Sequence, residues 1–405
     1  MRMINRLITF YLFLFTFLCT GSAQELKELS HRLDSVVQAA KMLETSQMGL
    51  LVYDLDDDSV VYARDARQTL RPASTMKLIT AITALDKLGA EYEYVTSLKT
   101  QRNATLRNGS KAPYETADSV KPTKTGDLYL VGAMDPLITE ADLRTMADSL
   151  RRTGIDTIRG MIYADRSMKD SDMYGEGWCW DDDNAMLSAL VLNRKDNMAE
   201  RLRTIMLADS ICVTGRTAAK RCPDDAVTIY EIRHSLRDVL VPMMKQSNNL
   251  YAESMFYHIG LTKGKPSTAK KAKAVEEELL ESICETSPIH RFADGSGLSL
   301  YNYVSAEIEV AFLRYAYSKE DIYNELIEAL PVAGIDGTLK DRMKGTAAEG
   351  NVRAKTGTLS GVFSLAGYCV AGNGHRLAFA ILNQGVMKGA YARGLQDRIC
   401  IEMCK

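Results

Sequence analysis

Apolar and polar positions follow the helical period in some segments of this chain and the strand period in others, which predicts a mixed fold. Residues 26–44 carry apolar side chains at helical spacing. The stretch MGLLVYDLDDDSVVYARD that follows predicts two strands around an acidic turn. LITAITALDKL, residues 78–88, predicts a buried helix with Pro72 near its first turn, where the missing N–H of proline costs little.

The pattern changes between residues 93 and 230. Short β-like runs such as TGDLYLVG and GMIYADRS alternate there with turns and with the helix ADLRTMADSLRRTG. We interpret this region as an inserted mixed α/β module that divides a larger domain into residues 24–92 and 231–405. After it come the helical patterns HSLRDVLVPMMKQS and NNLYAESMFYHIG, then a polar loop that opens a further helix. Two strands, NVRAKTGTLSGVFSLAGYCVAG and HRLAFAILNQG, and a terminal helix end the chain.

The first residues have the three parts of an export signal. MRMINR carries two arginines, residues 7–18 are almost wholly apolar, and small residues end at Ala23. We therefore expect a signal peptide over 1–23, cleaved after Ala23, and a periplasmic mature chain. The apolar run is short for a transmembrane helix, and no later segment has the ~18 apolar residues that one needs. Uncleaved anchoring, or lipidation through Cys19, is the alternative.

The charge of the chain and its histidine, cysteine and acidic patterns disfavour several classes of function. With a net charge of -2 and 25% charged residues, nothing indicates nucleic acid or a strongly charged membrane surface as partner. The five histidines form no HExxH pattern and the cysteines no CxxC pattern, which disfavours a zinc enzyme. The acidic run Asp54–Asp58 lacks the glycine and distal glutamate of a calcium loop, so a solvated turn is expected. Among the seven cysteines after the signal, Cys212 and Cys222 are the first pair to test for a disulfide.

Two Ser-x-x-Lys patterns offer a serine nucleophile: Ser74 to Lys77 in STMK, and Ser267 to Lys270 in STAK. A lysine can take the proton of a serine only if burial or a second cation lowers its pKa. Residues three apart on a helix lie close enough for that transfer. STAK lies in a lysine-rich polar loop, where a lysine stays charged. STMK opens an apolar helix that would bury Lys77, and the N-terminus of that helix can stabilise negative charge near Ser74.

Two further motifs follow STMK, namely Ser247-Asn248-Asn249 and Lys355-Thr356-Gly357. A second KTG, at residues 124–126, precedes both and leads into DLYLVG inside the inserted module. We interpret that copy as a turn. Lys355 instead begins a glycine-containing, strand-like stretch whose edge could face a ligand. The three ordered motifs therefore point to one site.

The ordered set STMK, SNN and KTG resembles the serine DD-peptidases, or penicillin-binding proteins, and the related serine β-lactamases. PASTMKLITA, KQSNNLYAE, DGSGLSLYNYVS and RAKTGTLSGVFSLAGY resemble the class C low-molecular-mass penicillin-binding proteins, the D-alanyl-D-alanine carboxypeptidase/endopeptidase family. GDLYLVGAMDPLIT and GWCWDDDNAMLSALVLN resemble the inserted module of that family. The resemblance covers residues from about 48 to 390 and implies an α/β fold in which helices flank an antiparallel sheet.

The resemblance also implies a catalytic role for three residues. Ser74 would be the acylated nucleophile, Lys77 its proton acceptor, and Ser247 the relay that returns a proton to the leaving amine. It implies no metal and no cofactor.

Five residues would bind substrate. Asn249 would hold Lys77 and the substrate backbone. Lys355 would supply the second cation and a counter-charge for the substrate carboxylate, to which Thr356 could also hydrogen-bond. Gly357 lies between these groups and Thr358, whose N–H would complete the oxyanion hole with that of Ser74.

One departure from the family pattern concerns the insertion. Ser247 lies only 173 positions after Ser74 (247 − 74). We infer that a further β-rich subdomain of relatives is missing or much reduced.

The function implied is a D-alanyl-D-alanine carboxypeptidase, a DD-endopeptidase or both, acting on peptidoglycan stem peptides and acylated by β-lactams. One alternative is a β-lactamase, which would need efficient deacylation, but the large insertion between the first two motifs argues for a cell-wall substrate. Another is a non-catalytic protein that binds the cell wall or β-lactams.

Overall fold

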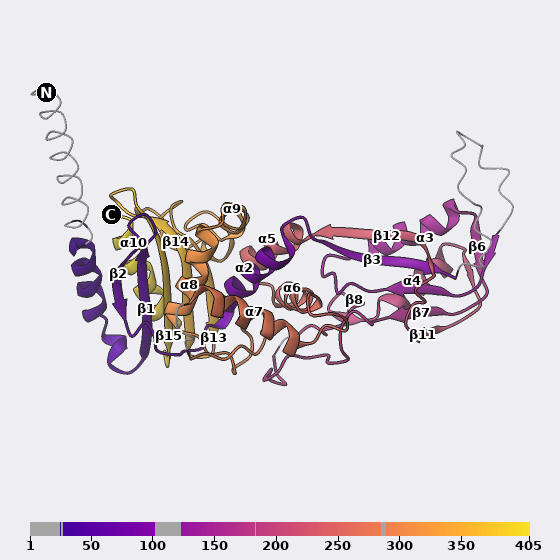
Figure 1. Cartoon of the computed structure of the whole chain (residues 1–405), viewed down its shortest axis with the longest axis horizontal. Coiled ribbons are helices and arrows are strands. Elements are labelled where there is room, and N and C mark those ends of the chain that lie inside the picture. The colour runs from indigo at the N-terminus through magenta and orange to yellow at the C-terminus, as the bar shows by residue number, and fades with distance from the viewer. Residues whose placement is uncertain (1–24, 26, 102–122, 183, 285–288) are drawn as a thin grey trace, which may run out of the picture.

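A computed structural model describes residue 25 and residues 27–101, 123–182, 184–284 and 289–405. The predicted signal peptide lies outside these residues. Figure 1 shows an elongated molecule, with the main domain and the C-terminus at one end and the inserted module at the other. Within the described part of the chain, no helix is long and apolar enough to cross a membrane.

The main domain contains a five-stranded antiparallel sheet in the order β13-β14-β15-β1-β2, which confirms the expected fold class. Its strands are β1 (Gln47–Asp54), β2 (Ser59–Arg64), β13 (Arg353–Leu359), β14 (Val362–Val370) and β15 (Arg376–Gln384). The sequence predicted two C-terminal strands where there are three. Gly361, at φ +73°, turns the chain between β13 and β14, within the stretch NVRAKTGTLSGVFSLAGYCVAG that the sequence suggested as one strand.

Helices cover both faces of this sheet, so its central strands are buried almost throughout. Successive residues of β1 point to opposite cores: Leu51 and Tyr53 pack into the core with α2, and Leu50 and Val52 into the core with α10. The first core contains α2 (Met76–Leu88), α5 (Leu236–Gln246), α6 (Asn249–Leu261), α7 (Ala269–Ile283), α8 (Ala306–Tyr317) and α9 (Glu320–Ala329). The second contains a helix over residues 27–38, the 3-10 turn η1 (Lys41–Glu44) and α10 (Gly389–Met403).

The inserted module has its own core and two larger sheets, in the orders β11-β7-β5-β3-β12 and β10-β6-β4. Strands β3 and β12 pair antiparallel from Glu93 to Ser235, so the return strand ends five residues beyond the boundary at 230 that the sequence suggested. The module contains β3 (Glu93–Thr100), β4 (Thr123–Thr125), β5 (Leu128–Val131), β6 (Ile155–Ile158), β7 (Ile162–Asp165), β8 (Val191–Leu192), β9 (Lys195–Asp196), β10 (Cys212–Val213), β11 (Thr217–Ala219), β12 (Val227–Ser235), α3 (Glu140–Arg152) and α4 (Met198–Ala208).

Several local expectations were wrong. The KTG at residues 124–126 does not form a turn, because Lys124 and Thr125 lie in β4, paired with β6 at the far end of the module. The acidic turn after β1 is not wholly solvated. Asp54 is fully buried, accepts hydrogen bonds from the N–H groups of Asp56 and Asp57, and raises the pKa of His375, which it contacts at 2.8 Å.

The STAK segment also differs from its expected solvated loop. Ser267 is fully buried and donates a hydrogen bond to the carbonyl oxygen of Tyr257 at 2.6 Å, while Lys270 is exposed on the first turn of α7. Ser267 therefore bonds to the backbone, and within the described residues no hydrogen bond joins it to the exposed Lys270.

The cysteines of the described residues are all free thiols in the structure. Cys212 is exposed on β10 and Cys222 is buried, and no disulfide joins this pair that the sequence had singled out.

Candidate active site

Ser74 lies in the 3-10 turn η2 (Ala73–Thr75), directly before α2. The turn is held from both sides, because the Thr75 hydroxyl donates to the carbonyl oxygen of Pro72 at 2.8 Å and also contacts the Glu309 carboxyl group. Ala73 adopts a left-handed φ of +49°, which is uncommon for a residue other than glycine. Ala73 and Thr75 are buried and Ser74 is partly exposed, so this turn presents the hydroxyl of Ser74 to solvent.

Lys77 lies one helical turn later and is completely buried. Its Nζ donates hydrogen bonds to Ser74 Oγ at 2.9 Å, to Asn249 Oδ1 at 2.8 Å and to the carbonyl oxygen of Ser296 at 2.7 Å. Burial lowers the pKa of Lys77 to about 7, against the opposing influence of Asp294 and Glu253. A substantial fraction of the amine is therefore neutral near pH 7 and can accept a proton.

The SNN motif is the link between α5 and α6. Ser247 ends α5 in the left-handed conformation, at φ +60°. Asn248 turns its side chain back to the backbone, accepting from the N–H of Leu250 at 3.0 Å, and so begins α6. This division leaves Ser247 and Asn249 to face the two lysines: Asn249 accepts from Lys77, and Ser247 accepts from Lys355 Nζ at 2.7 Å.

The second KTG lies on β13, the edge strand of the sheet. Lys355 is completely buried, and its Nζ also donates to the carbonyl oxygen of Thr356 at 2.7 Å. Burial, and then the nearby Lys77, hold the pKa of Lys355 well below its ordinary value. The Thr356 hydroxyl donates to the hydroxyl of Thr338 at 2.8 Å, and the side chain of Thr358 is exposed.

Two glycines allow the surrounding segments to approach Ser74. A Cβ on Gly357 would lie 2.0 Å from Ser364 Oγ and 3.0 Å from the nitrogen of Ser74. A Cβ on Gly297, which has a φ of +76°, would lie 1.8 Å from the carbonyl oxygen of Ala73. Any side chain at either position would displace the backbone around Ser74.

The loop around Asp294 has a role that the sequence did not reveal. Asp294 is buried and accepts hydrogen bonds from the Trp178 indole at 2.8 Å, from the Asn302 amide at 2.7 Å and from two backbone N–H groups. Glu253 accepts from the N–H of Ser296 at 2.8 Å. Together they fix the Ser296 carbonyl against Lys77. Burial and the charge of Asp294 raise the pKa of Glu253 to about 8.

A cavity of about 470 Å³ opens beside Ser247 and Asn249. Its opposite wall comes from the inserted module, including Pro136–Thr139 and Arg194. A ligand that reached Ser74 could therefore extend into a space that both domains enclose.

Glu309 provides a test of how the turn that carries Ser74 is held. Burial raises the pKa of this carboxyl group to about 8, and its Oε2 has no hydrogen-bond partner. A raised folded-state pKa gives stability that is fully present below the unfolded value, near 4.5, and is lost as the pH rises through about 8.

Between pH 6 and pH 9 we therefore expect the unfolding free energy of wild type to fall by about 3 kcal/mol more than that of Glu309→Gln. Urea unfolding at the two pH values measures this difference. The matched control is Glu307→Gln, which alters a partly exposed acid on the same helix. An equal pH dependence in wild type and Glu309→Gln would contradict the assigned pKa.

The chain matches the family model described as D-Ala-D-Ala carboxypeptidase 3 (S13) over residues 29–199 and 186–400. It is 29% identical over 485 aligned residues to a D-alanyl-D-alanine carboxypeptidase of Actinomadura sp. (strain R39), covering 96% of this chain and 86% of that protein.

Solved structures show the same fold. Penicillin-binding protein 4 of Haemophilus influenzae superposes with a TM-score of 0.81 at 21% identity, covering 92% of this chain and 99% of that one. The same protein complexed with a β-lactam superposes with a TM-score of 0.73 at 22% identity and the same coverage. Because the family model matches most of the chain, the chain belongs to the D-Ala-D-Ala carboxypeptidase 3 (S13) family and is a serine-type peptidase.

Proposed function

We propose that the chain hydrolyses the D-alanyl-D-alanine bond of peptidoglycan stem peptides through an acyl-enzyme on Ser74. The observation that carries the proposal is the position of the buried Lys77 amine, 2.9 Å from Ser74 Oγ and 2.8 Å from Asn249 Oδ1. A neutral amine at that distance can take the hydroxyl proton as the oxygen attacks the carbonyl carbon.

The later steps use the second cation and the edge strand. The tetrahedral oxyanion would accept from the N–H groups of Ser74 and Thr358, and such donors typically contribute on the order of 3 kcal/mol each. As the C–N bond breaks, Ser247 would pass a proton to the leaving amine, drawing on Lys355, whose Nζ lies 2.7 Å away. Water would then attack the acyl carbonyl and give a proton back to Lys355 through Ser247, while Lys77 would return its proton to the Ser74 oxygen as the acid leaves.

Substrate recognition follows from charge and position. Lys355 is buried with its pKa held low, so a bound carboxylate would favour its charged form and pair with it. Thr356 would supply a second hydrogen bond to that carboxylate. Strand β13 lies at the edge of the sheet, so an extended peptide could align beside it. The remainder of the stem peptide would occupy the cavity beside Asn249.

β-Lactams would acylate the same serine, and the β-lactam complex of the similar Haemophilus protein supports this expectation. The cell-wall substrate and the N-terminal sequence together support export to the periplasm with cleavage after Ala23.

Digestion of purified muropeptides tests the proposal. Monomeric pentapeptides and cross-linked dimers are incubated with the protein and the products are identified by mass spectrometry. Release of D-alanine from pentapeptides indicates carboxypeptidase activity, and conversion of dimers to monomers indicates endopeptidase activity. If neither substrate changes while penicillin is hydrolysed rapidly, the protein is a β-lactamase. No reaction with any of the three would favour a non-catalytic protein.

The rate of acylation should rise with pH through a midpoint near 7. Burial lowers the pKa of Lys77 to about 7, so the amine is protonated and inactive below this value and neutral above it. Stopped-flow acylation with a fluorescent penicillin between pH 5.5 and 9 measures the profile. A rate that stays constant or falls across pH 6–8 would show that Lys77 is not the proton acceptor.

A further inference from the structure

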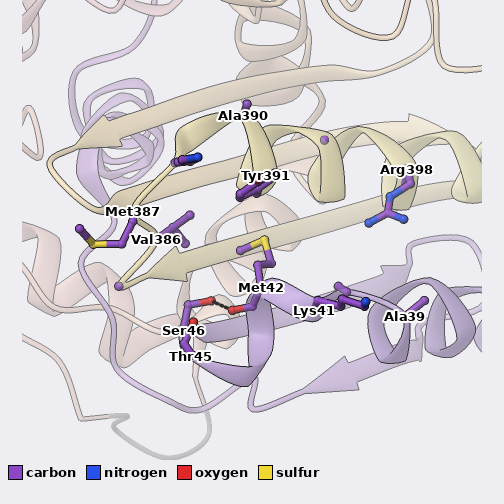
Figure 2. Close-up of a pocket in the computed structure, with 14 residues that line it drawn as sticks. Ala39, Lys41, Met42, Thr45, Ser46, Val386, Met387, Ala390, Tyr391 and Arg398 are labelled. Carbon is purple, nitrogen blue, oxygen red and sulfur yellow. Dashed lines mark hydrogen bonds between the residues drawn. The ribbon is translucent and has the colours of Figure 1, made fainter.

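A second cavity lies away from the active site, on the sheet face that α10 covers. It has a volume of about 840 Å³ and lies between η1 on one side and the β15–α10 loop with the first turns of α10 on the other. Figure 2 shows this groove, with Met42 and Tyr391 extending into it from facing elements. None of the eight site residues lines it.

The groove is largely apolar and partly open to water. Met42, Val386, Met387 and Ala390 line it together with Tyr391. Met387 is 95% exposed and Tyr391 is 61% exposed, although burial of apolar side chains of this size is favourable. A ligand with an apolar body would cover them, and the volume lies within the usual range for small-molecule sites.

Three cations line the same groove, from three separate segments: Lys41 from η1, Lys388 from the loop before α10, and Arg398 from α10. No aspartate or glutamate lines it. Within the described residues, none of the three forms an ion pair, although the Lys388 ammonium lies 6.0 Å from the centre of the Tyr391 ring. Figure 2 shows Lys41 and Arg398 on facing walls. The electrostatic environment therefore favours an anion.

The walls are held by the fold and do not depend on a ligand. The N–H of Val386 donates to the carbonyl oxygen of Gly361 at 3.1 Å, which ties the loop to the β13–β14 turn. On the other wall, the hydroxyl of Ser46 donates to the carbonyl oxygen of Met42 at 2.7 Å. Binding to a preformed site costs less conformational entropy than binding to a site that must first be ordered.

We propose that this groove binds an amphipathic monoanion, a carboxylate with a single unbranched alkyl chain. The chain packs on Met42, Val386 and Tyr391, and the carboxylate pairs with the cations at the rim. A carboxylate can pair with cations on facing walls, because its oxygens accept charge-assisted hydrogen bonds from lysine and arginine. The apolar lining selects against small hydrophilic anions.

Calorimetric titration with decanoate, kept below its critical micelle concentration, tests the proposal. We expect saturable binding of one decanoate per chain and at least tenfold weaker binding of decyltrimethylammonium, which has the same chain with the opposite charge. Equal binding of the two amphiphiles, or no saturable binding of decanoate, overturns the proposal. Binding to anionic phospholipid vesicles in the absence of decanoate binding would identify a membrane contact instead and also overturn it.

Two variants locate the binding. The double variant Lys41→Gln/Arg398→Gln removes facing charges, and Ala390→Trp fills the groove; each should weaken decanoate binding at least tenfold. Lys270→Gln, an exposed lysine on α7, is the matched control and should bind as wild type does. Unchanged acylation by penicillin shows that each variant is folded. Decanoate binding that persists in both folded groove variants would place the ligand elsewhere and contradict the assignment.

Discussion

Replacing Ser74 with alanine is expected to abolish acylation by penicillin and to lower D-alanine release by about 10⁴-fold or more, because no other group can form the ester intermediate. The hydroxyl is the one partly exposed side chain in a turn whose other residues are buried. Its removal leaves the hydrogen bonds of Thr75 and the packing of α2 unchanged. Fluorescent penicillin labelling and D-alanine release measure the two effects.

The matched control for Ser74→Ala is Ser267→Ala, which removes the serine of the other Ser-x-x-Lys pattern. Ser267 is buried and bonded to the Tyr257 carbonyl, so this change should lower stability somewhat while leaving labelling intact. Labelling that survives in Ser74→Ala and disappears in folded Ser267→Ala would move the nucleophile to the STAK segment.

Lys77→Gln should slow acylation by about 10³-fold, within the range that general bases typically contribute. Glutamine can keep hydrogen bonds to Asn249 and Ser296, but it cannot accept a proton at neutral pH. The variant should therefore also lose the rise in acylation rate through pH 7, because the group whose pKa is about 7 is absent. Acylation kinetics across this pH range separate the loss of a base from a general loss of structure.

Lys270→Gln is the corresponding control, since Lys270 is exposed and has no contact with Ser74. It should acylate at the wild-type rate. If Lys77→Gln keeps both the wild-type rate and the pH dependence, another group accepts the proton from Ser74.

The sequence predicted those features of the fold and the site that depend on residues close together in the chain. Lys77 lies three positions after Ser74, and the apolar helix that follows already predicts a buried amine. The Ser-Asn-Asn link could likewise be placed between two helices from pattern alone. The hairpin of β1 and β2 was predicted from its alternation and acidic turn. In each case the decisive spacing is a few residues along the chain.

Features that depend on distant segments could not be derived in this way. The Ser296 carbonyl contacts Lys77 across 219 residues of sequence, and a carbonyl group leaves no mark in a side-chain pattern. Nothing in the sequence marks Glu253 and Glu309 as buried, because glutamate side chains usually face water. The strand character of Lys124 depends on pairing with β6, a partner about thirty residues away.

Peptide mapping after a short reaction with benzylpenicillin tests most directly whether Ser74 is the nucleophile. The protein is quenched in acid and digested, and the site of the covalent adduct is located by tandem mass spectrometry. We predict one penicilloyl group per chain, on Ser74, which persists for minutes after the free drug is removed. An adduct on any other residue, or penicillin turnover without an adduct that outlasts the free drug, would contradict it.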